Sequence, residues 1–265
     1  MINTDIKGIT LIEILIGIVV SSIMMGAMLT SYNVVNGSYS QIIDKASIGN
    51  STRSFSEMLL RDIRMAGYKF FDDNLITETN NNLDIPIEII KNDGGCCDSI
   101  TLVYGDFDRS QAGDKRFIRY KVQYTSAPQI IEDGIVSGVF QILKTKQKWN
   151  NKNNDWEVSD DDTDTYASEI VTDFVSDIEI VAKDRLGNIM TPPPNLTNSN
   201  RSMINSIYTV EIFLTYRTKK NFYKRNRERT TLSLYGKDRD QVFNDRFLRE
   251  PVILNAYTRN LESLR

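Results

Sequence analysis

The fold is decided by one stretch near the start of the 265-residue chain, Ile9-Thr-Leu-Ile-Glu-Ile-Leu-Ile-Gly-Ile-Val-Val-Ser-Ser-Ile-Met-Met-Gly-Ala-Met-Leu29. These 21 residues contain one charged side chain, Glu13, and the next charged side chain is Asp44. At about 1.5 Å per residue the stretch forms a helix of roughly 31 Å, close to the thickness of a bilayer's hydrocarbon core. The pattern therefore predicts a membrane-spanning helix.

Two features separate this stretch from a secretory signal peptide. It is longer than the apolar region of such a peptide, and no small-residue cleavage site follows Leu29. Glu13 is the unusual residue, because a carboxylate inside an apolar helix costs on the order of 3 kcal/mol on insertion and so usually has a partner and a function. The simpler alternative is that Glu13 lies near the membrane interface and its side chain reaches water.

The segment Lys7-Gly-Ile-Thr-Leu-Ile-Glu13 resembles the prepilin leader and cleavage site of type IV pilins and type II secretion pseudopilins. The resemblance implies that a prepilin peptidase cuts between Gly8 and Ile9 and N-methylates Ile9. Glu13 then occupies the fifth mature position, as the family requires, although phenylalanine is commoner than Ile9 at the first. A carboxylate at Glu13 can pair with the free amine of a neighbouring subunit, which offsets both desolvation costs and sets the axial register.

After the span the sequence predicts continued helix up to Gly67, since the first proline is Pro86 and apolar residues recur at helical spacing. The helix end, Leu59-Leu-Arg-Asp-Ile-Arg-Met-Ala-Gly-Tyr68, resembles that of PilW-type minor pilins, with GspJ-type pseudopilins as the nearest alternative. Its charged residues are expected either to form i,i+3 pairs or to tie the helix to the sheet; they are Arg61, Asp62 and Arg64.

Strands are expected after Leu83, where apolar and polar residues alternate in segments rich in β-branched and aromatic side chains. The expected strands are 99–104, 117–124, 134–143, 206–216 and 251–261, the last ending at the family-like Arg259-Asn260. Residues 169–182 are expected to form a short turn or helix that leads into a strand, and surface loops are expected at 149–165, 191–200 and 221–240.

The expected fold class is α+β, in which a long amino-terminal (transmembrane) α-helix packs on a carboxyl-terminal antiparallel β-sheet head, as the resemblance to type IV pilins implies. The expected division is a leader at 1–8, the transmembrane half of the helix at 9–31, its soluble half at 32–67 and the β-rich head at 68–265.

The composition argues against most enzyme classes. The chain contains no histidine, which excludes Ser-His-Asp and Cys-His catalysis, His-ligated zinc and an imidazole base. The net charge of −3 does not favour a dedicated nucleic-acid binder. A basic patch surrounds Tyr223 and is interpreted as a solvated edge, with DNA contact or subunit docking as alternatives; its members are Lys219, Lys220, Lys224, Arg225, Arg227 and Arg229.

Two further groups of residues are candidates for chemistry. Cys96 and Cys97 are adjacent, so a disulfide between them requires a strained ring; free thiols or a bond to another chain are the alternatives. Asp160, Asp162 and Asp164 alternate as weak candidates for calcium ligands, but Thr165 stands where an EF-hand needs glycine. We interpret these carboxylates as a solvated acidic loop and expect no cofactor apart from this calcium alternative.

The resemblance implies a non-enzymatic minor pilin of the PilW type that helps initiate or cap a type IV pilus. Its expected location is the bacterial inner membrane, with a single pass and a periplasmic carboxyl-terminal head, and then the pilus tip. The expected partners are other minor pilins, a major pilin and the prepilin peptidase, without nucleic acid or a small-molecule substrate. The alternatives are a GspJ-like pseudopilin of type II secretion and a tip adhesin or DNA-binding pilin.

Overall fold

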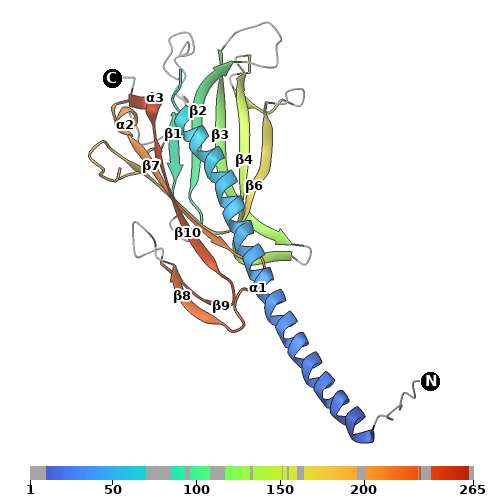
Figure 1. Ribbon diagram of the computed structural model, residues 1–265. Helices are drawn as coiled ribbons and strands as arrows, with labels where there is room; N and C mark the ends of the chain where they lie inside the picture. Colours follow the sequence, from blue (N-terminus) through green and yellow to red (C-terminus); the bar gives the residue numbers. More distant parts are fainter. Residues whose placement is uncertain are drawn as a thin grey trace, which may run out of the picture. The chain divides into compact units, whose positions relative to one another are not determined.

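The computed structural model describes residues 10–69, 85–92, 96–107, 117–131, 134–150, 152–153, 155–159, 164–195, 201–231, 233 and 240–262. The chain divides into two compact units, Met1–Ala46 and Ser47–Arg265. Helix α1 (Leu11–Met65) begins in the first unit and ends in the second. The second unit also contains every described strand and two short helices, α2 (Arg201–Ser206) and α3 (Arg259–Glu262) (Figure 1).

Helix α1 is continuous over 55 residues, as the lack of proline predicts. Its end is marked by Gly67, two residues beyond the last helical residue, which has a φ of +78°. This left-handed conformation is the usual way to end a helix and costs glycine little, because glycine has no Cβ. The predicted end of the helix at Gly67 is confirmed to within two residues.

The main sheet has eight strands, and every pair in it is antiparallel. Its strand order is β1-β2-β3-β4-β6-β7-β10, and β5 pairs with β4 off this path; β8 and β9 form a separate two-stranded sheet. The strands are β1 (Ile87–Ile90), β2 (Ser99–Phe107), β3 (Phe117–Ile131), β4 (Gly134–Asn150), β5 (Asp155–Glu157), β6 (Tyr166–Lys183), β7 (Thr209–Arg217), β8 (Arg227–Thr231), β9 (Gln241–Asp245) and β10 (Arg249–Tyr257).

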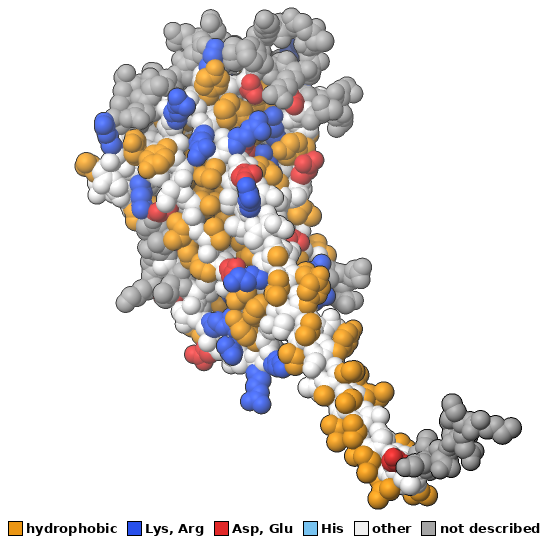
Figure 2. All heavy atoms as spheres, viewed as in Figure 1, with side chains coloured by type: hydrophobic (Ala, Val, Ile, Leu, Met, Phe, Trp, Pro, Cys, Tyr) orange, Lys and Arg blue, Asp and Glu red, His pale blue; other side chains and the backbone are white. Residues whose placement is uncertain are grey.

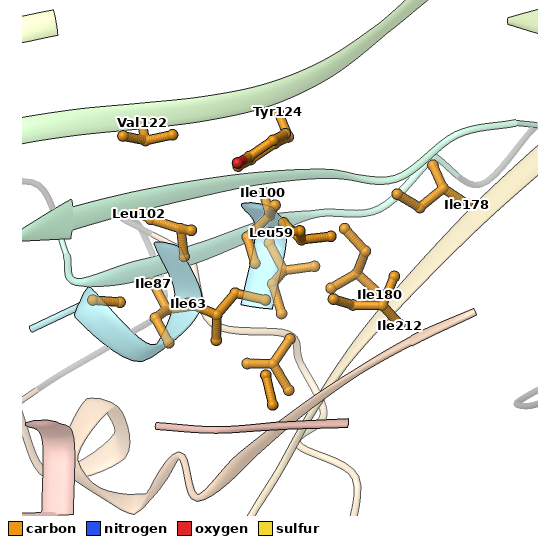
Figure 3. Close-up of a cluster of buried hydrophobic side chains, with 14 of the residues drawn as sticks. Leu59, Ile63, Ile87, Ile100, Leu102, Val122, Tyr124, Ile178, Ile180 and Ile212 are labelled. Atoms are coloured by element: carbon orange, nitrogen blue, oxygen red, sulfur yellow. The ribbon is translucent and has the colours of Figure 1, made fainter. Parts of the chain in front are cut away.

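The core lies between the carboxyl-terminal part of α1 and one face of the sheet (Figure 1). Phe55, Leu59 and Ile63 follow one another at helical spacing and are completely buried. Figure 3 shows Leu59 and Ile63 among apolar side chains from β1, β2, β3, β6 and β7. Burial of each such side chain contributes about 1.5–3 kcal/mol, so this face holds the helix on the sheet. The predicted α+β architecture is confirmed.

Four details of the sequence prediction are wrong. Residues 169–182 form no turn or helix, because they lie within the single long strand β6. The expected loops at 149–165 and 221–240 contain β5 and the start of the β8–β9 hairpin. The expected strand 206–216 begins only at Thr209, after α2. The last strand ends at Tyr257, and Arg259-Asn260 begin α3 instead.

Candidate functional site

The first turn of α1 holds Glu13 in a capping box with Thr10. The backbone N–H and the hydroxyl of Thr10 donate to Glu13 Oε2 at 3.2 and 3.0 Å, and the Glu13 N–H donates to Thr10 Oγ1 at 3.4 Å. This reciprocal arrangement satisfies donors that otherwise lack partners at a helix start. Gly8 and Ile9, the predicted cleavage site, lie outside the described residues.

The amino-terminal part of α1 exposes an apolar surface on all sides. Its large hydrophobic side chains are exposed from Leu11 to Ile43, and an 18-residue window reaches a mean hydropathy of 2.2, enough in length and composition to cross a membrane. Figure 2 shows hydrophobic side chains along one face of the amino-terminal part of this helix. An exposed apolar surface of this extent normally contacts a membrane or other protein chains.

Two hydroxyl groups within this apolar surface are satisfied by the helix itself. Ser22 Oγ donates to the carbonyl of Ile18 at 2.8 Å, and Thr30 Oγ1 donates to the carbonyl of Gly26 at 2.9 Å. Such bonds lower the cost of placing a hydroxyl in an apolar environment. The segment therefore needs no partner helix to satisfy these two groups.

At the other end of α1, Asp62 ties the helix to the sheet. Asp62 Oδ2 accepts a hydrogen bond from the Tyr124 hydroxyl at 2.5 Å and lies 2.7 Å from Lys144 Nζ. Tyr124 and Lys144 are opposite each other on β3 and β4, which places both side chains under the same helix turn. Burial, and then the negative charge of Asp62, raise the pKa of Tyr124 far above its ordinary value, so the phenol stays a donor.

This finding decides between the two expectations for the charged helix end. Asp62 ties the helix to the sheet, whereas Arg61 and Arg64 are exposed. Sequence reasoning missed Lys144 and Tyr124, although a lysine at an inward position of a strand is a usable signal. An aspartate at helical spacing with Leu59 and Ile63 also belongs to the buried face, where a charge needs a partner.

A cavity of about 210 Å³ adjoins this buried pair. Its described charged lining residues balance, because three are basic (Arg61, Lys144 and Lys146) and three are acidic (Asp62, Asp106 and Asp164). Asp164 is thus the one calcium candidate that the structure describes, and it lies at this cavity rather than in a cluster of three ligands; Asp160 and Asp162 lie outside the described residues. Calcium binding stays a prediction.

The two cysteines lie in a segment that is anchored to the sheet by Asp98. The structure joins Cys96 to Cys97 as a disulfide, and both sulfurs lie within 4.8 Å of a carboxylate oxygen of Asp177. Asp98 is buried, accepts from the Ile180 N–H at 2.8 Å and forms an ion pair with Lys91 at 2.8 Å. The pairing of the cysteines in the cell stays a prediction.

The basic patch, expected to be a solvated edge, includes two arginines that contact other parts of the chain. The guanidinium groups of Arg227 and Arg229 lie 4.8 and 3.9 Å from the centre of the Tyr223 ring. Arg229 also donates to the carbonyl of Phe247 at 3.1 Å. Part of the positive charge is therefore already engaged within the chain.

Comparisons with known proteins found a family match at the amino terminus and a similar solved structure. Residues 4–29 match the family model of the prokaryotic N-terminal methylation motif. A type IV-like pilin from Thermus thermophilus is similar in structure, with 12% sequence identity, coverage of 81% of this chain and 98% of that chain, and a TM-score of 0.49. No curated protein matches the chain. The chain thus carries a prokaryotic N-terminal methylation motif at the start of an apolar helix, and the carboxyl-terminal part of that helix packs on an antiparallel sheet.

Proposed function

We propose that the chain is a non-enzymatic subunit of a pilus or pseudopilus, and more narrowly a PilW-like minor pilin that helps initiate or cap a type IV pilus. The observation that carries this proposal is the methylation motif at residues 4–29, which leads directly into the exposed apolar part of α1. Before assembly the apolar segment anchors the chain in the inner membrane, with its head in the periplasm. During assembly the same segment packs against the helices of other pilins.

Glu13 has two successive partners in this proposal. In the isolated chain both hydrogen bonds from Thr10 reach Glu13 Oε2. A carboxylate has a second oxygen and about four acceptor sites, so Oε1 can still accept from the amine of a processed neighbour's first residue. The capping box lowers the cost of holding Glu13 in the membrane, and the amine then supplies the opposite charge and the register between subunits.

Processing is tested by intact-mass spectrometry of the protein purified from membranes. The proposal expects a chain that begins at Ile9 and carries one added methyl group on its amine. A chain that retains residues 1–8 in cells with an active prepilin peptidase contradicts it.

The assembly role is tested by affinity purification of the carboxyl-terminally tagged chain from membranes, with partners identified by mass spectrometry. Recovery of minor pilins and a major pilin supports the PilW-like role. Recovery of secretion pseudopilins favours a GspJ-like role in type II secretion and leaves the proposed role of Glu13 unchanged. Recovery of no pilin-like partner contradicts the assembly role.

A further inference from the structure

A second cavity, of about 340 Å³, lies at the carboxyl-terminal end of α1. Its described lining comes from three separate parts of the chain: Arg64 from α1, Tyr208 from just before β7, and Tyr257, Thr258 and Arg259 from the junction of β10 and α3. We call it the arginine-tyrosine pocket. Its volume falls in the range of about 300–1,000 Å³ that is typical of binding sites.

The walls of this pocket are held in place by hydrogen bonds and ring contacts. The Thr258 hydroxyl donates to the carbonyls of Ile207 and Tyr208 at 2.7 and 3.1 Å, which joins the β10 end to the segment before β7. The Tyr208 and Tyr257 rings meet edge to face with centroids 5.6 Å apart. The pocket is thus formed without a ligand, so binding does not include the free-energy cost of ordering its walls.

The charge of the described lining is unbalanced. Arg64 and Arg259 are both exposed, and neither forms an ion pair with any residue that the structure describes. The described lining contains no carboxylate, in contrast to the cavity beside Asp62, where basic and acidic side chains are equal in number. Two free guanidinium groups beside two tyrosine rings favour a planar anion that can accept paired hydrogen bonds.

We propose that the arginine-tyrosine pocket binds an aspartate or glutamate side chain on a segment of a partner protein. Exposed arginine and tyrosine around a preformed pocket is the composition of energetic hot spots in protein–protein interfaces. The choice of a protein as the partner rests on the proposed assembly role, whereas the preference for a carboxylate rests on the pocket alone. The partner contact therefore adds a specific anchor at the end of α1 opposite to Glu13.

Binding is tested with the full chain in detergent micelles and an acetylated, amidated hexaglutamate peptide as the probe. The Arg64→Gln/Arg259→Gln variant is expected to weaken binding at least about tenfold, because each arginine supplies charge-assisted hydrogen bonds. The matched control is Lys152→Gln/Arg185→Gln, which removes two positive charges from exposed positions outside both the pocket and the basic patch. The control is expected to bind within about twofold of the wild type.

Two further variants separate recognition from charge and from folding. Arg64→Lys/Arg259→Lys keeps the charge but not the paired donors, and is expected to bind more weakly than the wild type and more tightly than the glutamine pair. Tyr257→Ala leaves both arginines in place and is expected to weaken binding through the lost ring face. Equal losses of affinity in the Lys152/Arg185 control and in the Arg64→Gln/Arg259→Gln variant would overturn the proposal, and so would no loss in the Arg64→Gln/Arg259→Gln variant.

The nature of the ligand is tested in the same assay with polygalacturonate, an acidic polysaccharide. The assignment to a protein partner is overturned if polygalacturonate binds more tightly than hexaglutamate and if its binding depends equally on Arg64 and Arg259. Affinity purification with Arg64→Gln/Arg259→Gln then separates the two proposals. If the wild type recovers pilins and the variant recovers equal amounts, the pocket proposal fails and the assembly role stands; if the wild type recovers none, the assembly role fails.

Discussion

The side-chain amide of Asn260 donates a hydrogen bond to the backbone carbonyl of Arg64 at 2.6 Å, across 196 residues of sequence. It also reaches the carbonyl of Met65 at 3.3 Å. These carbonyls belong to the last turn of α1, where helix ends leave carbonyls in need of donors. The Met65 carbonyl also accepts from the Tyr68 N–H at 2.9 Å, whereas the Arg64 carbonyl accepts from Asn260. The short helix α3 therefore caps the carboxyl-terminal end of α1.

We predict that Asn260→Ala lowers the free energy of unfolding of the head by about 1 kcal/mol, because the Arg64 carbonyl loses the Asn260 donor. Urea unfolding of the full chain in detergent, followed by near-ultraviolet circular dichroism, measures the change. Asn255→Ala serves as the control, since Asn255 is an exposed residue of β10. The cap is refuted if the two variants unfold at the same urea concentration.

Gly67 gives a second prediction at the same junction. A Cβ on Gly67 would lie 2.4 Å from Cδ2 of the buried Leu261, and the φ of +78° is itself unfavourable for alanine. Gly67→Ala is expected to destabilise the head by about 3 kcal/mol through backbone strain and overpacking together.

Gly187 separates these two causes. It has a φ of +84° but nothing within 4 Å of an added Cβ, so Gly187→Ala carries the backbone cost alone, about 1 kcal/mol. Thermal unfolding of both variants gives the difference. A Gly187→Ala variant as unstable as Gly67→Ala would mean that the contact with Leu261 contributes nothing.

Local patterns predicted the parts of the fold that depend on local chemistry. The apolar run from Ile9 to Leu29, the glycine stop at Gly67 and the alternating strands near 99–104 and 117–124 all correspond to elements of the structure where it describes them. In each case the conformation is determined by one apolar face of a helix or strand, or by one residue type, so a short segment of sequence contains enough information to predict it.

The errors arose where the conformation depends on distant pairing. Strand β6 has positive φ values at Ser168 and Phe174 and shifts its register against β4, so its alternation is interrupted and resembles a turn. Strand β8 is polar on both faces and is a strand only because β9 pairs with it. The pairing of Asp62 with Lys144 depends on the β3–β4 register, which no local pattern contains.

The Asp62–Lys144 pair leads to a third prediction. Asp62→Asn is expected to cost about 3–5 kcal/mol of stability, because it leaves the buried Lys144 ammonium without its counter-charge. Asp62→Leu/Lys144→Met removes both charges and is expected to recover a large part of that loss. Denaturant unfolding of the two variants measures the difference.

An exposed ion pair on the same helix is the matched control. Arg53 and Glu57 lie 3.0 Å apart at i,i+4 spacing, with most of both side chains exposed. Glu57→Gln should therefore change stability by less than about 0.5 kcal/mol. If Asp62→Asn costs no more than Glu57→Gln, the buried pair does not hold the helix on the sheet.

The pH dependence of stability has an identifiable source at Asp245. Burial opposes its ionisation, but hydrogen bonds from Arg249 and from the Phe247 N–H prevail and hold its pKa below the ordinary 3.8. The contacts of ionised Asp245 therefore contribute their full stabilisation of the folded state at pH values above the ordinary pKa of 3.8. As the pH falls from there through the lower folded pKa, the unfolded chain takes up the proton first and stability is lost. Between about pH 5 and about pH 2 the free energy of unfolding should fall less steeply for Asp245→Asn than for the wild type. An equally steep fall in both proteins would show that Asp245 is not a source of the pH dependence.

The last prediction concerns the two partners of Glu13. Glu13→Ala removes the carboxylate that would pair with a neighbour's amine and also breaks the capping box, whereas Thr10→Ala removes only the hydroxyl's part of the box. If the proposed pairing with the amine governs assembly, Glu13→Ala should abolish co-purification with pilins while the head still unfolds at the wild-type temperature.

Thr10→Ala then decides whether the box itself matters. Loss of the Thr10 hydroxyl should cost helix stability by about 1 kcal/mol at the first turn but leave the carboxylate able to meet the amine, so partner recovery should stay near the wild-type level. Quantitative mass spectrometry of tagged chains from membranes compares the two. Equal loss of partners in both variants would assign the effect to the helix start instead, and wild-type recovery with Glu13→Ala would remove the carboxylate from assembly altogether.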